Sequence, residues 1–201
     1  ALPISSYPFV KNPIPNVVQN LYDLLKLKIW RKYIINNICK LSLVFVSNYL
    51  YMSALKYLKF NKSDVDSNSF VINNSVGKVF EQNHFDPFSN KQYDFITIRS
   101  NLDSSTYCID LLCNIAINNP ELKFLLIGKG RYFDYNTLPK NIALLKESLN
   151  HEELTYYINI SKAAIMLTRN DSQGLMSCEL ATFGIPLITS RLPVTEEIFS
   201  C

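Results

Sequence analysis

The sequence has few of the features that mark nucleic-acid-binding or membrane-spanning proteins. Its 201 residues include 20 Lys and Arg and 17 Asp and Glu, for a net charge of +3, without an arginine-rich run. So small a charge, without alternating basic and aromatic residues, argues against a nucleic-acid partner. No signal peptide and no apolar span of about 18 residues is evident. The expected location is therefore the cytoplasm.

Cysteine and histidine are also scarce. The two histidines, His84 and His151, lie far from the cysteines in sequence, and no CxxC pair occurs. We therefore expect no metal site and no cofactor. The cysteines are odd in number and lie mostly within apolar helical patterns, which predicts small core residues in a reducing compartment. These five are Cys39, Cys108, Cys113, Cys178 and Cys201.

The composition is that of a globular protein. Hydrophobic residues make up 48% of the chain, which is enough for a sizeable core, so disorder is not expected. Four prolines fall within residues 1–15, which predicts an extended lead-in. The chain begins with Ala and stops just after a predicted helix start, so we expect a fragment of a longer protein.

Residues 163–190 form the most informative stretch. Residues 163–167 are an apolar run of strand length, and Asp171 and Ser172 are types that favour a helix N-terminus. Apolar residues then recur at helical spacing as far as Gly184, which is followed by Pro186. A glycine with a proline just beyond it is typical of a helix end, and residues 187–189 predict the next strand.

The polar residues of this stretch indicate a ligand. The start of a helix attracts anions, because its backbone N–H groups are unpaired and its dipole is positive there. Gly174 would let a phosphate approach that start closely, while Asp171 precedes the helix and Glu179 lies about one turn inside it. Carboxylates would repel a phosphate but can accept hydrogen bonds from hydroxyl pairs. Phosphate with two sets of hydroxyls points to a sugar nucleotide.

This pattern resembles a known family. The spacing Asp171-x7-Glu179, with Gly174, Gly184 and a final Glu196-Glu197-Ile198, resembles the E-x7-E signature of retaining glycosyltransferases of family four, which have the GT-B fold. The resemblance covers residues 93–200. It implies that Asp171 holds hydroxyls of the donor sugar and that Glu179 holds the ribose. It also implies that backbone amides near three residues meet the diphosphate: Gln173, Gly174 and Leu175.

The rest of the chain alternates helices and strands. Residues 16–38, 49–60, 107–117 and 151–158 are predicted helices; residues 41–46, 70–72, 93–98, 122–127 and 142–145 are predicted strands. Asn150 and Glu153 predict a capping box. The βαβ order indicates an α/β fold with a doubly wound parallel sheet. The resemblance divides it into the end of an N-terminal Rossmann-like domain (1–80), a linker (81–92) and a C-terminal nucleotide-sugar-binding domain (93–201).

Arg99 follows the strand 93–98 at its carboxyl end, where ligands bind in doubly wound sheets. The resemblance implies that this arginine binds the donor diphosphate together with a lysine and a nearby glycine. Thr106 and Cys108 stand at those two positions here. Lys129, between two glycines after the strand 122–127, is a candidate substitute, and the alternative is a turn residue.

The helix at residues 16–38 is basic. Its basic residues cluster at its middle: Lys26, Lys28, Arg31 and Lys32. Such a helix can lie on an anionic membrane, which would suit a lipid-linked acceptor and a peripheral location at the inner face of the membrane. The apolar positions spread around most of the helix, which favours an ordinary domain helix with a solvated face.

The leading hypothesis is a retaining glycosyltransferase. It would move a hexose-type sugar from a nucleotide-sugar donor to a hydroxyl of a glycan or lipid-linked acceptor, without a metal, in glycan, capsule or lipopolysaccharide biosynthesis. Arg99 and the helix amides would stabilise the departing diphosphate. The alternatives are a non-catalytic relative that binds a sugar nucleotide, with Thr106 and Cys108 marking lost catalysis, and a GT-B epimerase.

Overall fold

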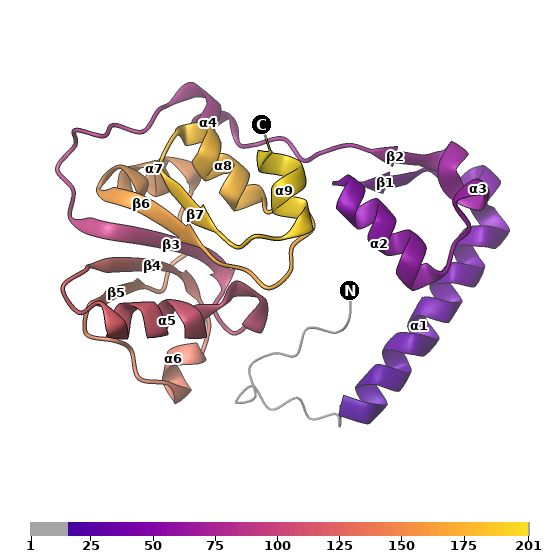
Figure 1. Cartoon of the computed structure of the whole chain (residues 1–201), viewed down its shortest axis with the longest axis horizontal. Coiled ribbons are helices and arrows are strands. Elements are labelled where there is room, and N and C mark those ends of the chain that lie inside the picture. Colours follow the sequence, from indigo (N-terminus) through magenta and orange to yellow (C-terminus); the bar gives the residue numbers. More distant parts are fainter. Residues whose placement is uncertain (1–15, 201) are drawn as a thin grey trace.

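The computed structural model describes residues 16–200, with side chains from residue 21 onward. A smaller part with a two-stranded sheet lies beside a larger part with a five-stranded sheet (Figure 1). The predictions for residues 1–15 and for Cys201 lie outside the described range.

The smaller part is built around one parallel strand pair. Strand β1 (Leu43–Phe45) pairs with β2 (Ser69–Val71), and helix α2 (Asn48–Leu58) connects them. Ser47 caps α2, because its hydroxyl accepts a hydrogen bond from the Leu50 amide at 3.1 Å. The remaining elements are α1 (Asn16–Asn37), η1 (Ile38–Lys40), α3 (Lys62–Val65) and η2 (Asp66–Asn68).

Helix α4 (Lys78–Gln82) lies across the boundary that the sequence predicts between residues 80 and 81. Phe80 is completely buried and packs in the core of the larger part, against the ring of Phe183. The helix therefore packs with the second domain, although the domain limits themselves stay a prediction.

The larger part holds five parallel strands in the order β5-β4-β3-β6-β7. This order, with β3 central and the chain winding outward to both edges, confirms the predicted α/β class and parallel sheet. The strands are β3 (Tyr93–Asn101), β4 (Phe124–Lys129), β5 (Ile142–Leu145), β6 (Ser161–Met166) and β7 (Leu187–Thr189).

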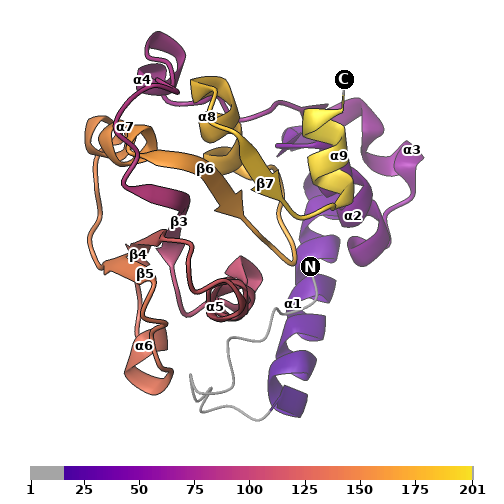
Figure 2. The same cartoon turned by 60° about the vertical axis from the view of Figure 1, so that its left-hand side comes forward.

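Helices cover both faces of this sheet (Figure 2). One core contains Ile158 and Leu180, and the other contains Leu112 and Leu126; all four side chains are at most 2% exposed. Such double coverage explains why the strands read as continuous apolar runs. The helical elements are η3 (Ser105–Tyr107), α5 (Ile109–Asn118), α6 (Tyr132–Tyr135), α7 (His151–Asn159), α8 (Leu175–Phe183) and α9 (Pro193–Phe199).

Several local predictions are confirmed. Strands β5 and β7 have the predicted limits, and Asn150 and Glu153 form the capping box, with hydrogen bonds of 2.9 and 2.8 Å. Helix α8 ends at Gly184 as predicted, and this glycine has a left-handed φ of 92°. Its start differs, because Gly174 with φ 75° occupies the N-cap and the helix begins at Leu175.

The cysteines follow the prediction in part. Cys108 and Cys113 are buried, and burial raises the pKa of Cys113 to about 11. Cys178 is half-buried. The expectation is wrong for Cys39, which is exposed, because α1 ends at Asn37 and Cys39 falls in the short turn η1.

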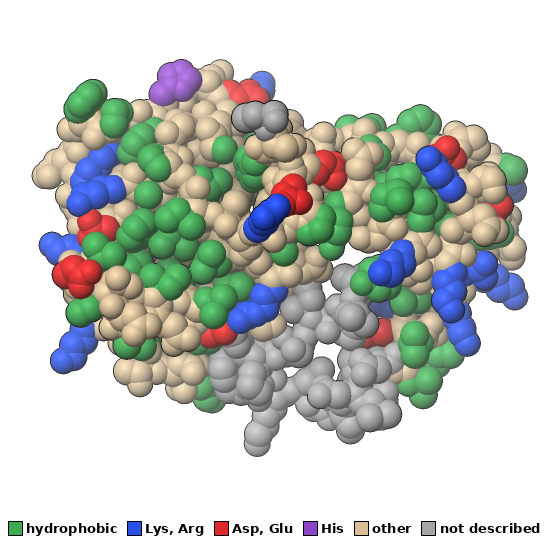
Figure 3. Space-filling model, viewed as in Figure 1, with side chains coloured by type: hydrophobic (Ala, Val, Ile, Leu, Met, Phe, Trp, Pro, Cys, Tyr) green, Lys and Arg blue, Asp and Glu red, His purple; other side chains and the backbone are tan. Residues whose placement is uncertain are grey.

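Helix α1 exposes apolar as well as basic side chains, which lie next to one another over it on the right of Figure 3. Ile29 is 69% exposed and Trp30 is 53% exposed. Within residues 16–200, no helix combines the length and apolarity needed to cross a bilayer. Peripheral membrane association and a cytoplasmic location stay predictions.

Candidate functional site

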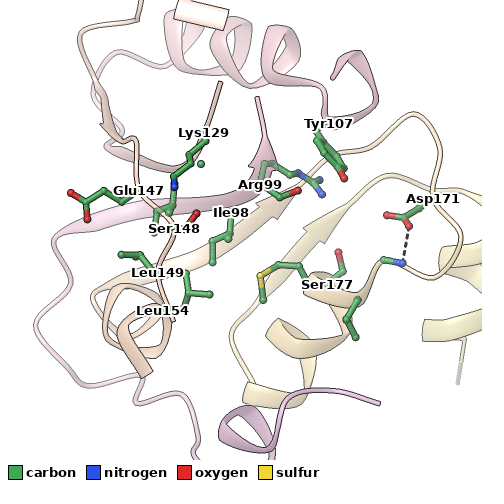
Figure 4. A pocket seen from close by; sticks show the side chains of 16 residues that line it. Ile98, Arg99, Tyr107, Lys129, Glu147, Ser148, Leu149, Leu154, Asp171 and Ser177 are labelled. Atoms are coloured by element: carbon green, nitrogen blue, oxygen red, sulfur yellow. Dashed lines mark hydrogen bonds between the residues drawn. The ribbon is translucent and has the colours of Figure 1, made fainter. Parts of the chain in front are cut away.

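A cavity of about 390 Å³ opens at the carboxyl ends of β3 and β4, beside the start of α8. Figure 4 shows Arg99 between Lys129 on one side and Tyr107 on the other, with Asp171 on the same side as Tyr107. Gly174 and Leu175 also line it. The carboxyl edge of a parallel sheet is the usual place for a ligand in this class of fold.

Arg99 is the most unusual side chain of the cavity. It is only 7% exposed; its Nη2 donates to the Leu167 carbonyl at 2.6 Å, and its guanidinium lies 4.8 Å from the ring centre of Tyr107. Its Nε is buried and has no hydrogen-bond partner among the described residues. Burial lowers the pKa of Arg99, while Tyr107 and Asp171 act in the opposite direction. A buried donor without a partner is costly, so this arrangement suits an anionic ligand.

The backbone around Arg99 explains its direction. The pairing of β3 with β4 shifts register between Ile98 and Asn101, so Arg99 lies in a bulge. Bulges beside functional sites re-aim side chains. Gly128 on β4 permits this approach, because a Cβ there would lie 2.1 Å from the Arg99 carbonyl oxygen.

Asp171 organises the loop before α8. Its Oδ1 accepts hydrogen bonds from the amides of Ser172 at 2.7 Å, Gln173 at 3.3 Å and Gly174 at 2.9 Å, the last shown in Figure 4. The backbone amides of Gln173 and Gly174, for which the resemblance implies a contact with the diphosphate, are thus engaged within the loop. The first turn of α8, beginning at Leu175, still presents unpaired N–H groups.

Gln173 and Glu179 face a different partner, the segment at residues 74–77. The side-chain amide of Gln173 accepts a hydrogen bond from the Asn74 backbone N–H at 2.7 Å through Oε1. Its Nε2 donates to the Asn74 backbone carbonyl at 3.0 Å. Glu179 Oε1 accepts from the Gly77 N–H at 3.2 Å. Both side chains are more than nine-tenths buried. They fasten this segment to α8, whereas Arg99 and Asp171 share the cavity.

Thr106 and Cys108 stand at the lysine and glycine positions of the family pattern, and the structure places them in different surroundings. Cys108 has φ 54°, a conformation that favours glycine, which fits the glycine that the resemblance implies there. Thr106 lines a second cavity, whereas Tyr107 reaches Arg99. The sequence pattern includes Tyr107 in a helix, but α5 starts only at Ile109. No local sequence signal marks Tyr107, because the left-handed conformation of the next residue, Cys108, is visible only in the structure.

The second cavity, of about 550 Å³, lies between α2 and the loops of the larger part. Tyr107 and Asp171 line both cavities and so form their shared wall. Aromatic and hydroxyl side chains of α2 line the far side: Tyr49, Ser53 and Tyr57. Arg169 also lines it and pairs with Asp110 at 2.6 Å.

No family model matches the chain, and no curated protein matches it in sequence. Solved structures do resemble it. A TarM variant from S. aureus, in complex with UDP and sugar ligands, aligns with a TM-score of 0.58 and 19% identity over 81% of this chain. The pneumococcal O-GlcNAc transferase GtfA with UDP and GlcNAc gives 0.58 and 16% over 80%. WaaG, a glycosyltransferase of lipopolysaccharide biosynthesis, gives 0.56 and 10% over 78%.

These similarities define the fold. The chain is an α/β protein of GT-B type, with a Rossmann-like parallel sheet of five strands and a smaller parallel pair. It spans about a third of the length of TarM and GtfA, since the alignments cover 32% of each. It spans 46% of WaaG.

Proposed function

We propose that the chain contributes the donor-binding part of a retaining glycosyltransferase. The observation that carries this proposal is the buried, incompletely partnered Arg99 at the carboxyl edge of a parallel sheet, facing a cavity that Asp171 also lines. The similarity in fold to glycosyltransferases supports it. The donor would be a nucleotide-activated hexose-type sugar.

The donor would lie with its diphosphate between Arg99 and the first turn of α8. Lys129 lines the same cavity and is exposed, so it can add a second, solvent-screened positive charge. Asp171 uses Oδ1 for the loop amides, which leaves Oδ2 to accept hydrogen bonds from sugar hydroxyls. Its carboxylate is thereby held in one orientation before the sugar arrives.

The main role that we assign to Glu179 is not the ribose contact that the resemblance implies. Its Oε1 holds the Gly77 amide, and Gln173 holds Asn74. We propose that both side chains act mainly by positioning: they fix the segment at residues 74–77 against α8 and the loop before it. A ribose could reach Glu179 only next to this segment.

The reaction would proceed with retention. The bond between the sugar C1 and the phosphate oxygen breaks, a bond from C1 to the acceptor oxygen forms on the same face, and the acceptor proton passes to the departing phosphate. Arg99 would stabilise the negative charge that develops on that phosphate. We propose that a glycan or lipid-linked acceptor enters through the second cavity, since Asp171 and Tyr107 separate it from the first. No metal takes part in this scheme.

Binding is the first test. The melting temperature of the chain should rise with UDP or GDP, and more with the matching nucleotide sugar, because a ligand that binds only the folded state stabilises it. Arg99→Met should abolish this rise, whereas Arg191→Met, at a position 91% exposed and outside the cavity, should keep it. A wild-type chain that responds to no nucleotide would refute the proposal.

Catalysis is the second test, and it separates the enzyme from a non-catalytic binder. One observation favours the binder: the amides expected to hold the diphosphate are engaged by Asp171. Donor hydrolysis and sugar transfer should be measured with the nucleotide sugar that raises the melting temperature most. Binding without hydrolysis or transfer would assign the chain to the non-catalytic class.

A further inference from the structure

We propose that the hydroxyl of Tyr107 donates a hydrogen bond to the diphosphate of the donor. Tyr107 would then be a substrate-contacting residue that complements Arg99 with a neutral donor. This inference rests on the proposed function, because it assigns a further contact within the same site.

The geometry around Tyr107 carries the proposal. Its ring lies under the Arg99 guanidinium at 4.8 Å, and its side chain lines both cavities. Figure 4 shows its hydroxyl directed to the same region as the guanidinium, on the side of Asp171. Among the described residues, no hydrogen bond to this hydroxyl is present. An anion bound by Arg99 would therefore find a second, uncommitted donor beside it.

The backbone on either side of Tyr107 is fixed. The Tyr107 amide donates to the Ser104 carbonyl at 3.1 Å, and the Arg169 amide donates to the Thr106 carbonyl at 2.9 Å. Cys108, at φ 54° and 2% exposed, then turns the chain into α5. The loop thus holds the side chain toward the cavities, which is what a positioned donor requires.

The chemistry suits a departing phosphate. A phenol donates to an oxyanion without the desolvation cost of a second buried cation, and such charge-assisted bonds are about twice as strong as neutral ones. The ring also keeps the Arg99 guanidinium in place by a cation–π contact. Because Tyr107 stands in the wall between the cavities, its hydroxyl would lie near the bond that breaks.

The test separates the hydroxyl from the ring. Tyr107→Phe removes only the hydroxyl, so the Arg99 contact and the fold should persist, as circular dichroism would check. Calorimetry of the full chain with UDP and GDP should show affinity falling roughly tenfold to a hundredfold. Uridine and guanosine, which lack phosphate and are followed by NMR titration, should bind as they do to the wild type.

A control variant sharpens the result. Tyr156→Phe is the matched control, because Tyr156 is 57% exposed on α7 and lines neither cavity; its affinities should not change.

Three outcomes would overturn the inference. Unchanged diphosphate affinity in Tyr107→Phe would show that only the ring matters. An equal loss for nucleosides and diphosphates would mean that the hydroxyl supports the site without touching phosphate. If the wild type binds neither UDP nor GDP, the proposed function and this contact fail together, and the wild-type titration alone reveals it.

Discussion

The carboxylate of Glu197, on α9, caps the N-terminus of α2, which lies 149 residues earlier in the chain. Oε1 accepts from the Asn48 N–H at 2.7 Å and from its side-chain amide at 3.1 Å, while Oε2 accepts from the Tyr49 N–H at 2.8 Å. A negative charge at this end also suits the helix dipole. Glu197 thereby ties the smaller part of the chain to the larger.

Replacing Glu197 should loosen this connection. We expect Glu197→Ala to lower the free energy of unfolding by about 1–2 kcal/mol, because two helix-start amides lose their acceptor. Hydrogen exchange of the first turn of α2 should accelerate more than that of the five-stranded sheet. Glu196→Ala is the neighbouring control: Glu196 pairs with Arg191 at the surface and should contribute less than about 1 kcal/mol. Equal effects of the two variants would argue against the cap.

Arg99 should increase the affinity for a nucleoside diphosphate without increasing the stability of the fold. Arg99→Met removes a buried charge whose Nε lacks a partner, so the melting temperature should stay the same or rise. The same variant should lose nucleoside diphosphate binding by tenfold or more. Lys129→Met, at an exposed position on the same cavity, should weaken binding less and leave stability unchanged. Thermal unfolding and calorimetry on the same samples measure both effects. A large loss of stability in Arg99→Met would contradict this view.

Gly128 should tolerate no side chain. A Cβ added at this position would lie 2.1 Å from the Arg99 carbonyl oxygen. We therefore expect Gly128→Ala to lower the free energy of unfolding by at least about 2 kcal/mol and to displace Arg99. Gly184→Ala is the comparison: there the nearest atom is 3.9 Å away, and the left-handed φ of 92° alone should cost about 1–2 kcal/mol. Urea unfolding of both variants gives the ranking, and a Gly184→Ala that proves the more damaging would reverse this reading.

Asp94 should make stability depend on acid. A hydrogen bond from Lys162 at 2.7 Å, and then the Lys123 amide at 2.8 Å, lower the pKa of this carboxyl group. A carboxylate with a lowered pKa stabilises the fold above its unfolded pKa of about 3.9, and this contribution is lost as the pH falls through the folded pKa. Because Lys162 is 63% exposed, the contribution should be modest, about 0.5–1 kcal/mol.

The measurement is the difference in unfolding free energy between wild type and Asp94→Asn. It should be constant from about pH 6 to 8 and shrink below about pH 4. Glu121→Gln changes an exposed acid at the surface and should show no such trend. A difference that stays constant into acid would contradict the role of Asp94.

Much of the larger part could be predicted because its signals are local. The strands β5 and β7, the capping box at Asn150 and the glycine end of α8 depend on apolar periodicity and on residues a few positions apart. The same signals failed where the backbone is irregular. The loop into α5 was predicted as helix, so Tyr107 was missed.

The sequence predicted residues that share a cavity, but it did not predict the hydrogen-bond partners of the others. Arg99, Lys129 and Asp171 do line one cavity. Gln173 and Glu179 instead hold Asn74 and Gly77, about a hundred residues earlier. Periodicity places Glu179 on α8, but it cannot say which segment packs against that face.

The amino-acid sequence alone determined the α/β class, the parallel sheet and the glycine end of α8, because helical spacing, capping and βαβ order are properties of short stretches. The tertiary structure decided which atoms remain available to a ligand. Hydrogen-bond partners such as Ser47 with Ser172, or Glu197 with Asn48, come from segments more than a hundred residues apart, and only folding brings them within reach.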